Sequence, residues 1–324
     1  MKMLKTRNNI LLIVPALVLL FAASLTSCKK DDNSDGSGGS GSAATTIKVT
    51  DAPFDDANVT GAFVTIAQIY VDGQAVQGFT KTTIDLAAFQ NGNTKTLGTF
   101  NLAGKSYSNI SFVLDFDTDA SGTAPGSYVL TTGNVKHKLT TSSNVITVVK
   151  NFTLQAGASN SLVADFDLRK MIVAQSGDPA DQYNFATSTE LQNDVRVVAE
   201  NNSSTISGTL TDGVSGSAKV VAYAYKKGTF NRTTEMSGQG ASNIQFSNAV
   251  SSALVSGGSY QLHFLESGDY EIHFASYKDT NADGKYELAG TLVVTTALNL
   301  DILNLHLNLN ATLAVNATAT AVLP

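Results

Sequence analysis

The chain has 324 residues, a formal net charge of −6, a single cysteine and no tryptophan. The acidic charge argues against nucleic acid as a partner, and one cysteine cannot form an internal disulfide. Stability must therefore come from apolar burial, and the many threonine, valine, serine, asparagine and glycine residues favour strands over helices.

Residues 1–27 are typical of a signal peptide. Lys2, Lys5 and Arg7 make the start basic, and residues 10–23 form an apolar stretch. A helix over that stretch would be about 21 Å long, short of the roughly 30 Å hydrocarbon core of a membrane. We therefore predict a cleaved leader and not a membrane span. Its removal takes away three positive charges and no negative ones, so the net charge becomes −9.

Cys28 ends the sequence Leu25-Thr26-Ser27-Cys28, which resembles the box at the cleavage site of bacterial lipoproteins. The resemblance implies a covalent diacylglycerol or acyl lipid on Cys28, and such a lipid would attach the chain to a membrane. The alternative is an ordinary signal peptide with a chance cysteine nearby. The following Lys30-Asp31-Asp32 resembles the export signal of Bacteroidetes surface lipoproteins, which implies the outer membrane, with the chain facing the exterior.

Residues 28–43 are predicted to be a lipidated tether, because residues 33–42 contain only glycine, serine, aspartate and asparagine and have nothing to bury. Short alternating segments with glycine or asparagine between them follow over residues 44–200. The predicted strands are 45–50, 62–71, 82–86, 97–102, 110–116, 128–130, 135–139, 145–154, 161–167, 171–174 and 195–199. This spacing predicts an antiparallel β-sandwich, and no segment shows the periodicity of a long helix.

Four pieces of this region resemble the bacterial lipoprotein domain of unknown function 4382. They are Thr50-Asp51-Ala52-Pro53, Thr83-Ile84-Asp85-Leu86, Ala103-Gly104 with Tyr107 and Ile110, and Asp165-Phe166-Asp167-Leu168. The resemblance covers residues 45 to about 200. It implies a β-rich envelope lipoprotein and no particular reaction.

Asn201-Asn202-Ser203-Ser204 is a polar break, after which residues 204–324 are predicted to form a second β-sandwich. The segment at 206–213 and a glycine-containing hairpin at 265–272 are similar to transthyretin-like and carboxypeptidase-regulatory-like sandwiches. The predicted fold is thus all-β, with two antiparallel β-sandwich domains. Near the end, residues 298–310 alternate leucine with polar residues, which predicts a half-buried strand with a phase slip at Ile302-Leu303.

The loop at residues 279–287 has the oxygen ligands of a calcium site at alternate positions. Asp279, Asn281 and Asp283 occupy positions one, three and five, and Lys285 and Glu287 would add a carbonyl and a carboxylate. The twelfth position is glycine, where a calcium loop of the helix–loop–helix type has glutamate. The alternative is a hairpin loop rich in Asx turns that needs no metal.

Three further groups of side chains have both a functional and a structural explanation. Asp115 and Asp117, and Asp165 and Asp167, flank phenylalanines and could supply the acid and base of a glycosidase. Strand alternation with a polar outer face explains the same spacing. His263 and His273 could lie near each other across a hairpin, but they lack a third ligand for zinc, and we expect solvent-facing sheet residues instead. Tyrosines 107, 128 and 183 are better explained as packing than as sugar-binding platforms.

The sequence therefore favours a non-catalytic lipoprotein of the outer membrane that binds a glycan or a surface protein or builds surface structure. One alternative is a glycan-processing hydrolase that uses the strand carboxylates. The other is a calcium-dependent adhesion or binding module.

Overall fold

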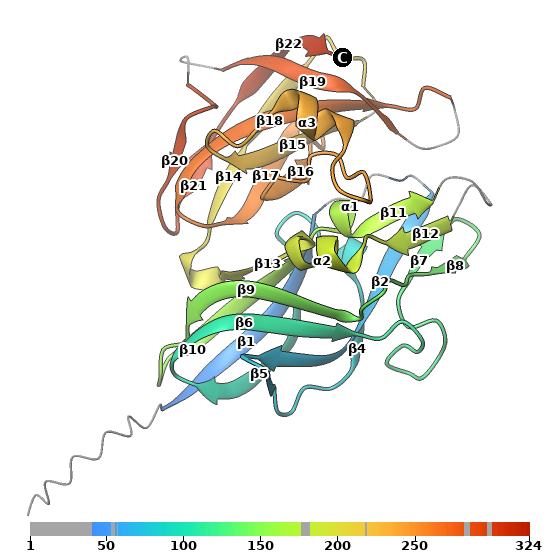
Figure 1. Cartoon of the computed structure of the whole chain (residues 1–324). Helices are drawn as coiled ribbons and strands as arrows, with labels where there is room; N and C mark the ends of the chain where they lie inside the picture. The colour runs from blue at the N-terminus through green and yellow to red at the C-terminus, as the bar shows by residue number, and fades with distance from the viewer. Residues whose placement is uncertain are drawn as a thin grey trace, which may run out of the picture. The chain divides into compact units, whose positions relative to one another are not determined.

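Strands account for most of the regular structure in this chain, as its β-branched composition predicts (Figure 1). The computed structural model describes residues 41–52, 56, 58–175, 182–217, 219–281, 286–296 and 300–324. The fold is all-β with several antiparallel sheets, which confirms the predicted class. Three strand pairs in the described residues are parallel, and one of them positions the site discussed below.

The described residues of the first half contain thirteen strands and three short helical segments. The strands are β1 (Ser42–Asp51), β2 (Val59–Val71), β3 (Gln74–Ala75), β4 (Thr82–Asp85), β5 (Lys95–Ala103), β6 (Ser106–Leu114), β7 (Tyr128–Thr131), β8 (Val135–Lys138), β9 (Val145–Thr153), β10 (Ser159–Phe166), β11 (Ile172–Gln175), β12 (Gln182–Phe185) and β13 (Val195–Ala199). The helical segments are η1 (Leu86–Ala88), α1 (Leu168–Met171) and α2 (Ser188–Asp194).

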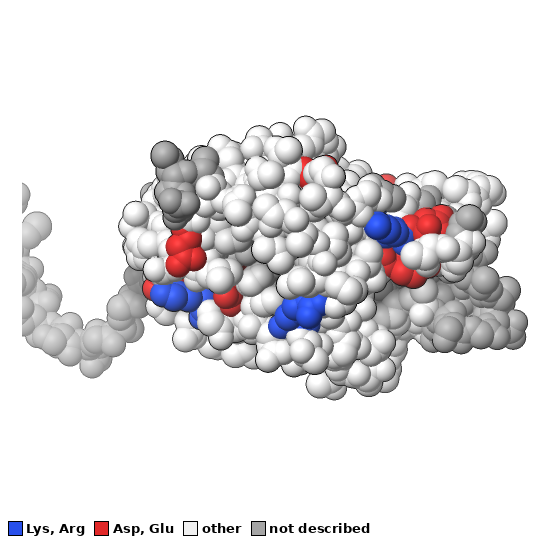
Figure 2. Space-filling model, turned by 90° about the horizontal axis from the view of Figure 1, so that it is seen from above, with Lys and Arg blue, Asp and Glu red and all other residues white. Residues whose placement is uncertain are grey.

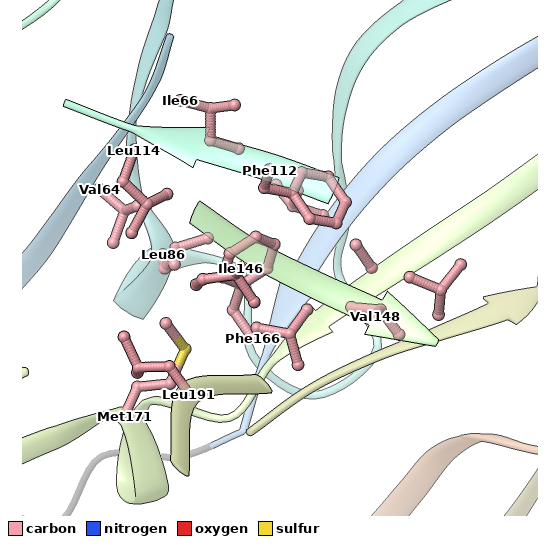
Figure 3. Packing of buried hydrophobic residues seen from close by; sticks show 14 of the residues in the cluster. Val64, Ile66, Leu86, Phe112, Leu114, Ile146, Val148, Phe166, Met171 and Leu191 are labelled. Carbon is pink, nitrogen blue, oxygen red and sulfur yellow. The ribbon is translucent and has the colours of Figure 1, made fainter. Parts of the chain in front are cut away.

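Two sheets of this half pack face to face. One has the order β13-β10-β1-β5, and the other has the order β8-β7-β2-β6-β9, with β3 and β4 also paired to β2. Their inward side chains form one core, in which the rings of Phe112 and Phe166 pack edge to face with their centroids 5.3 Å apart. Figure 3 shows Phe112, Ile146 and Phe166 in this core, with Met171 and Leu191 from α1 and α2 closing one end.

The second half begins after the short helical turn η2 (Glu200–Asn202), and its strands form two buried hydrophobic clusters of their own. These strands are β14 (Ser204–Asp212), β15 (Lys219–Lys226), β16 (Ser251–Leu254), β17 (Ser259–Leu265), β18 (Gly268–Lys278), β19 (Glu287–Thr296), β20 (Leu305–Leu307), β21 (Thr312–Ala314) and β22 (Ala317–Leu323), with the helix α3 (Arg232–Ser237). They follow the order β16-β15-β18-β19-β22-β14-β17, and the two end strands β16 and β17 contact each other. The sheet therefore curls around its core.

The predicted hairpin at residues 265–272 is wrong. β17 ends at Leu265 and β18 begins at Gly268, but β17 pairs with β14 whereas β18 pairs with β15, β19 and β20. The short connection therefore carries the chain from one side of the curled sheet to the other. Since the local pattern of a hairpin and of such a crossing is the same, only the pairing partners distinguish them.

The predicted strand at residues 298–310 is also largely wrong. Residues 297–299 lie outside the described part, residues 302–304 form turns and a bend, and only β20 is strand. β20 pairs with β18, as expected for a strand that would otherwise leave an open edge. Leu305 and Leu307 are buried, and Leu309 is 57% exposed.

Helices in the described residues are short, the longest being the seven residues of α2. In that part of the chain, no helix has the length and apolar character needed to cross a membrane.

Candidate functional site

The site lies where two parallel strands end at the same edge of a sheet. β1 and β10 run side by side with Thr50 opposite Asp165 and Asp51 opposite Phe166. Parallel strands have their carboxyl ends on one edge, so Asp51 and Asp165 are neighbours there. The chain then turns into α1, whose first backbone N–H, that of Leu168, donates a 3.0 Å hydrogen bond to Asp51 Oδ1.

Alternation along β10 decides which way the acidic side chains point. Phe166 is fully buried in the core shown in Figure 3, so Asp165 and Asp167 on either side of it face the opposite way. The predicted solvated outer face is wrong for this pair, because both aspartates are buried. The second half of the chain covers them.

Three basic side chains join the carboxylates to that covering segment. Arg196, opposite Asp165 on β13, lies 2.7 Å from Asp165 Oδ2 and also donates to the backbone carbonyls of His263 and Phe264. Arg169 donates to Asp167 Oδ2 at 2.9 Å and to the carbonyl of Gln245 at 2.7 Å.

Lys170 completes this set. Its Nζ lies 3.3 Å from Asp167 Oδ2 and donates to the carbonyl oxygens of Ser247 and Ala249. The same contact region includes Glu190 on α2, which accepts hydrogen bonds from the backbone N–H and the hydroxyl of Ser242. Acids on one half and backbone carbonyls on the other are therefore bridged by the same cations.

A cavity of about 420 Å³ lies against these side chains. One wall holds Asp165, Asp167, Lys170, Glu190, Asp194 and Arg196, and the other is formed by residues 239–251. That second wall contributes amides, hydroxyls and apolar groups but no titratable side chain. A volume of this size is within the range of small-molecule sites.

Burial and the neighbouring charges separate the pKa values of these carboxyls. Burial raises the pKa of Asp51 well above its usual range, and it also raises that of Asp165 despite the attraction of Arg196. Burial opposes ionisation of Asp167 too, but Arg169 and Lys170 together outweigh it and lower its pKa. Burial raises the pKa of Asp194 to about 7, with Lys170 only partly offsetting it.

Asp194 differs from the other acids in having no partner. It is the last residue of α2 and is 6% exposed, and its side chain makes no hydrogen bond or ion pair with the described residues. Its Oδ2 is fully enclosed. The negative end of the helix also disfavours a carboxylate at that position.

The structure separates the two aspartate pairs that were considered together as glycosidase candidates. Asp115 and Asp117 follow β6, in the other sheet, and pair with Lys81 at 2.8 Å and Lys138 at 2.7 Å. Burial opposes the ionisation of Asp115, but hydrogen bonds from Lys81 and the backbone lower its pKa to about 2. Asp117 is an exposed surface residue.

The predicted calcium site lies partly outside the described residues, which include Asp279, Asn281 and Glu287 but not Asp283 or Lys285. Glu287 Oε2 accepts hydrogen bonds from the backbone N–H and the hydroxyl of Thr280, at 2.9 and 2.8 Å. No group of three or more metal-binding side chains occurs within the described part of the chain. Calcium binding stays a prediction, as does lipid attachment at Cys28, which also lies outside the described residues.

The two histidines are placed in different surroundings. His263 on β17 lies against Gly92 of the first half, whereas His273 on β18 stacks on Phe230 with the ring centroids 3.6 Å apart. Since β17 and β18 do not pair, the predicted proximity across a hairpin is wrong. Burial lowers the pKa of both side chains, which favours the neutral form.

Comparison with known proteins bears on the first half of the chain. Residues 42–187 match the family described as "Domain of unknown function (DUF4382)". This match supports the family resemblance predicted for residues 45 to about 200, and it includes Asp51, Asp165 and Asp167. Asp194, Arg196 and the whole second half lie beyond it, and the transthyretin-like resemblance of the second half is not confirmed. No curated protein matches the chain.

Solved structures give only distant similarities. A leucine-rich repeat protein of Bacteroides thetaiotaomicron is 10% identical with a TM-score of 0.21, over 85% of this chain and 26% of that one. The minor pilin of Streptococcus agalactiae is 10% identical with a TM-score of 0.19, over 86% and 97%. The major pilin subunit of Bacillus cereus is 9% identical with a TM-score of 0.19, over 86% and 71%. TM-scores this low support no statement about this chain.

Sequence reasoning missed Asp194, Arg196, Lys170 and Glu190 as members of the site. The available signal was local: Asp165-Phe166-Asp167-Leu168-Arg169-Lys170 places two acids and two bases within six residues at the end of a predicted strand. Asp194 carries no such signal, because its isolation depends on which segment covers it.

Proposed function

We propose that the protein is a non-catalytic lipoprotein of the outer membrane that faces the cell exterior and acts as a binding or structural module. The structural observation that carries this proposal is the use of Arg169, Lys170 and Arg196 to bridge the two halves. These cations bind buried acids of the first half and backbone carbonyls of the second half. The two halves are therefore joined, which suits a domain displayed on a flexible tether.

The charge distribution is compatible with such a module. The face in Figure 2 is mostly uncharged, with scattered acidic and basic side chains and no large region of one sign. A mature net charge of −9 also disfavours binding to nucleic acid or to anionic lipid head groups. We therefore propose a lipid on Cys28 as the attachment and a glycan or a surface protein as the partner.

Metabolic labelling with a clickable palmitate tests the anchor. We expect the wild-type protein to be labelled and to fractionate with the outer membrane, and the Cys28→Ser protein to lose both properties. Protease treatment of intact cells should release wild-type fragments. An unlabelled wild-type protein that fractionates like Cys28→Ser would contradict the proposal, as would complete protection from external protease.

A glycan-processing hydrolase is the second candidate, and one observation favours it. Asp165 lines the cavity with a raised pKa, and a glycosidase acid needs that property. Its 2.7 Å ion pair with Arg196 argues for a structural role instead. Turnover of a glycan that is lost in Asp165→Asn but kept in Asp117→Asn would establish the enzyme in place of the non-catalytic module.

A further inference from the structure

We propose that the cavity between α2, β10 and residues 239–251 binds a small organic molecule through a primary ammonium group placed against Asp194. This inference deepens the proposed function, because it assigns a ligand class to the binding module. It rests on three features of the described residues: the unpaired carboxylate, the size of the cavity and the arrangement of the surrounding charges.

The unpaired carboxylate is the first feature. Asp165 is compensated by Arg196, Asp167 by Arg169 and Lys170, and the oxygens of Glu190 accept hydrogen bonds from Thr187 and Ser242. Asp194 alone among the acids lining the cavity has no such partner, although it is 6% exposed. A buried carboxylate without a partner is costly to keep unless it serves a ligand.

The cavity itself indicates an organic ligand. Its volume of about 420 Å³ far exceeds the space of one water molecule. Metal-binding clusters are absent from the described residues, so a chelated metal ion does not fit the geometry. The other wall includes Gln239, Asn248 and Ser251. Their side chains already hydrogen-bond to Glu235, to each other and to the His263 carbonyl, so the ammonium contact with Asp194 is the interaction that a ligand would add.

The surrounding charges favour a cation over an anion. The lining contains four acids and two bases, and both bases are already engaged by Asp165 and Asp167 and by backbone carbonyls. An anionic ligand would have to displace those contacts, whereas an ammonium group would complete the one missing pair. Because Oδ2 of Asp194 is fully enclosed, a primary ammonium would donate to Oδ1.

Binding should depend on pH in a defined direction. Lys170, Arg169, Asp167 and Glu190 all act on Asp194, and burial raises its pKa to about 7. An alkylammonium stays charged throughout this range and prefers the ionised carboxylate. Its affinity should therefore rise about tenfold between pH 6 and pH 8, with a proton released on binding below pH 7.

The probe is 4-amino-1-butanol, and 1,4-butanediol is its uncharged match of equal length. Titration calorimetry on the full chain in detergent should show saturable binding of the amine, in the millimolar range expected for so few atoms, and none of the diol. Asp194→Asn should lose about tenfold in affinity at pH 8 and lose the pH dependence. Asp117 is an exposed carboxylate outside the cavity. Asp117→Asn is therefore the matched control and should bind the amine as wild type does.

Three results would overturn the inference: no saturable amine binding, equal binding of amine and diol, or unchanged binding by an Asp194→Asn protein that unfolds cooperatively. None of them affects palmitate labelling at Cys28, so this failure and that of the anchor proposal can be told apart.

Discussion

At the scale of single residues, Asp194 illustrates a conflict between local and global preferences. A carboxylate at the carboxyl end of a helix is unfavourable there, and enclosure without a partner adds a desolvation cost. Asp167, whose backbone N–H donates a 3.0 Å hydrogen bond to the Asp194 carbonyl, avoids both costs, because it lies at the N-cap of α1 and pairs with Arg169 and Lys170. Two aspartates of one site therefore have pKa values shifted in opposite directions: that of Asp167, which pairs with two cations, is lowered, and that of Asp194, which pairs with none, is raised.

This conflict predicts how stability varies with pH. Asp194 has a folded-state pKa of about 7 against an ordinary value of 3.8, so the folded protein holds this proton to a higher pH than the unfolded chain does. Its contribution to stability is therefore lost as the pH rises from about 4 to about 7. Asp194→Asn should be more stable than wild type at pH 8, by up to about 4 kcal/mol, and equally stable below pH 4.

Urea unfolding at pH 4 and pH 8 measures this difference. Asp117→Asn is the control, because its side chain is 83% exposed and should shift neither midpoint by much. A gain for Asp194→Asn that was the same at both pH values would mean that the carboxyl does not titrate as described.

At the scale of elements, the leucine-rich tail shows why alternation alone does not define a strand. Leu300 and Leu303 belong to the same pattern as Leu305 and Leu307, yet they are exposed and outside any strand. Among the described residues of this run, only Leu305–Leu307 pairs with β18 as a strand, although the carbonyl of Ile302 also accepts a hydrogen bond from the Ile272 N–H. Pairing with β18 therefore makes a strand of only Leu305–Leu307, although the alternating pattern is longer.

Leucine-to-alanine substitutions at two neighbouring positions of that pattern should separate the two environments. Leu307 is fully buried in the core of the second half, so Leu307→Ala should lower the free energy of unfolding by about 2–5 kcal/mol. Leu309→Ala, at a position 57% exposed, should change it by less than about 1 kcal/mol. Equal effects in chemical denaturation would show that this tail does not pack as described.

At the scale of the whole described body, residues 40–324 form one compact unit although their strands belong to separate sheets and cores. The contacts responsible are the cations of the first half that reach carbonyls of residues 245–264, together with Ile244, which packs into the core of the first half. Removal of one buried cation weakens the compensation of its carboxylate and leaves a backbone carbonyl without a donor, and this makes the junction sensitive to single substitutions.

Arg169→Met should test that sensitivity. The substitution keeps much of the side-chain length but removes the bonds to Asp167 and to the Gln245 carbonyl, at a cost of about 3–5 kcal/mol. In calorimetry, wild type should unfold in one transition, and the variant at lower temperature or in two transitions. Lys138→Met, which removes an exposed ion pair with Asp117, should cost less than about 1 kcal/mol. An unchanged transition in Arg169→Met would contradict the described junction.

Much of the fold follows from local sequence. Alternation at 45–50, 62–71 and 145–154 predicted β1, β2 and β9 closely. Successive residues of a strand point to opposite faces, so a strand with one buried face alternates apolar and polar residues. The same alternation put Asp165 and Asp167 on the face opposite Phe166. It did not indicate that another segment covers that face, so the aspartates were expected in solvent.

The sequence by itself determined the strand-rich class and the family resemblance of the first half, since these depend on composition and on short contiguous motifs. Lipid attachment at Cys28 depends on such a motif too and stays a prediction. Only the tertiary structure decided that β17 and β18 lie apart, that Leu305–Leu307 alone becomes strand, and that Asp194 is enclosed without a partner. Each of these depends on contacts between residues far apart in the chain, and burial, pairing and pKa values arise from such contacts.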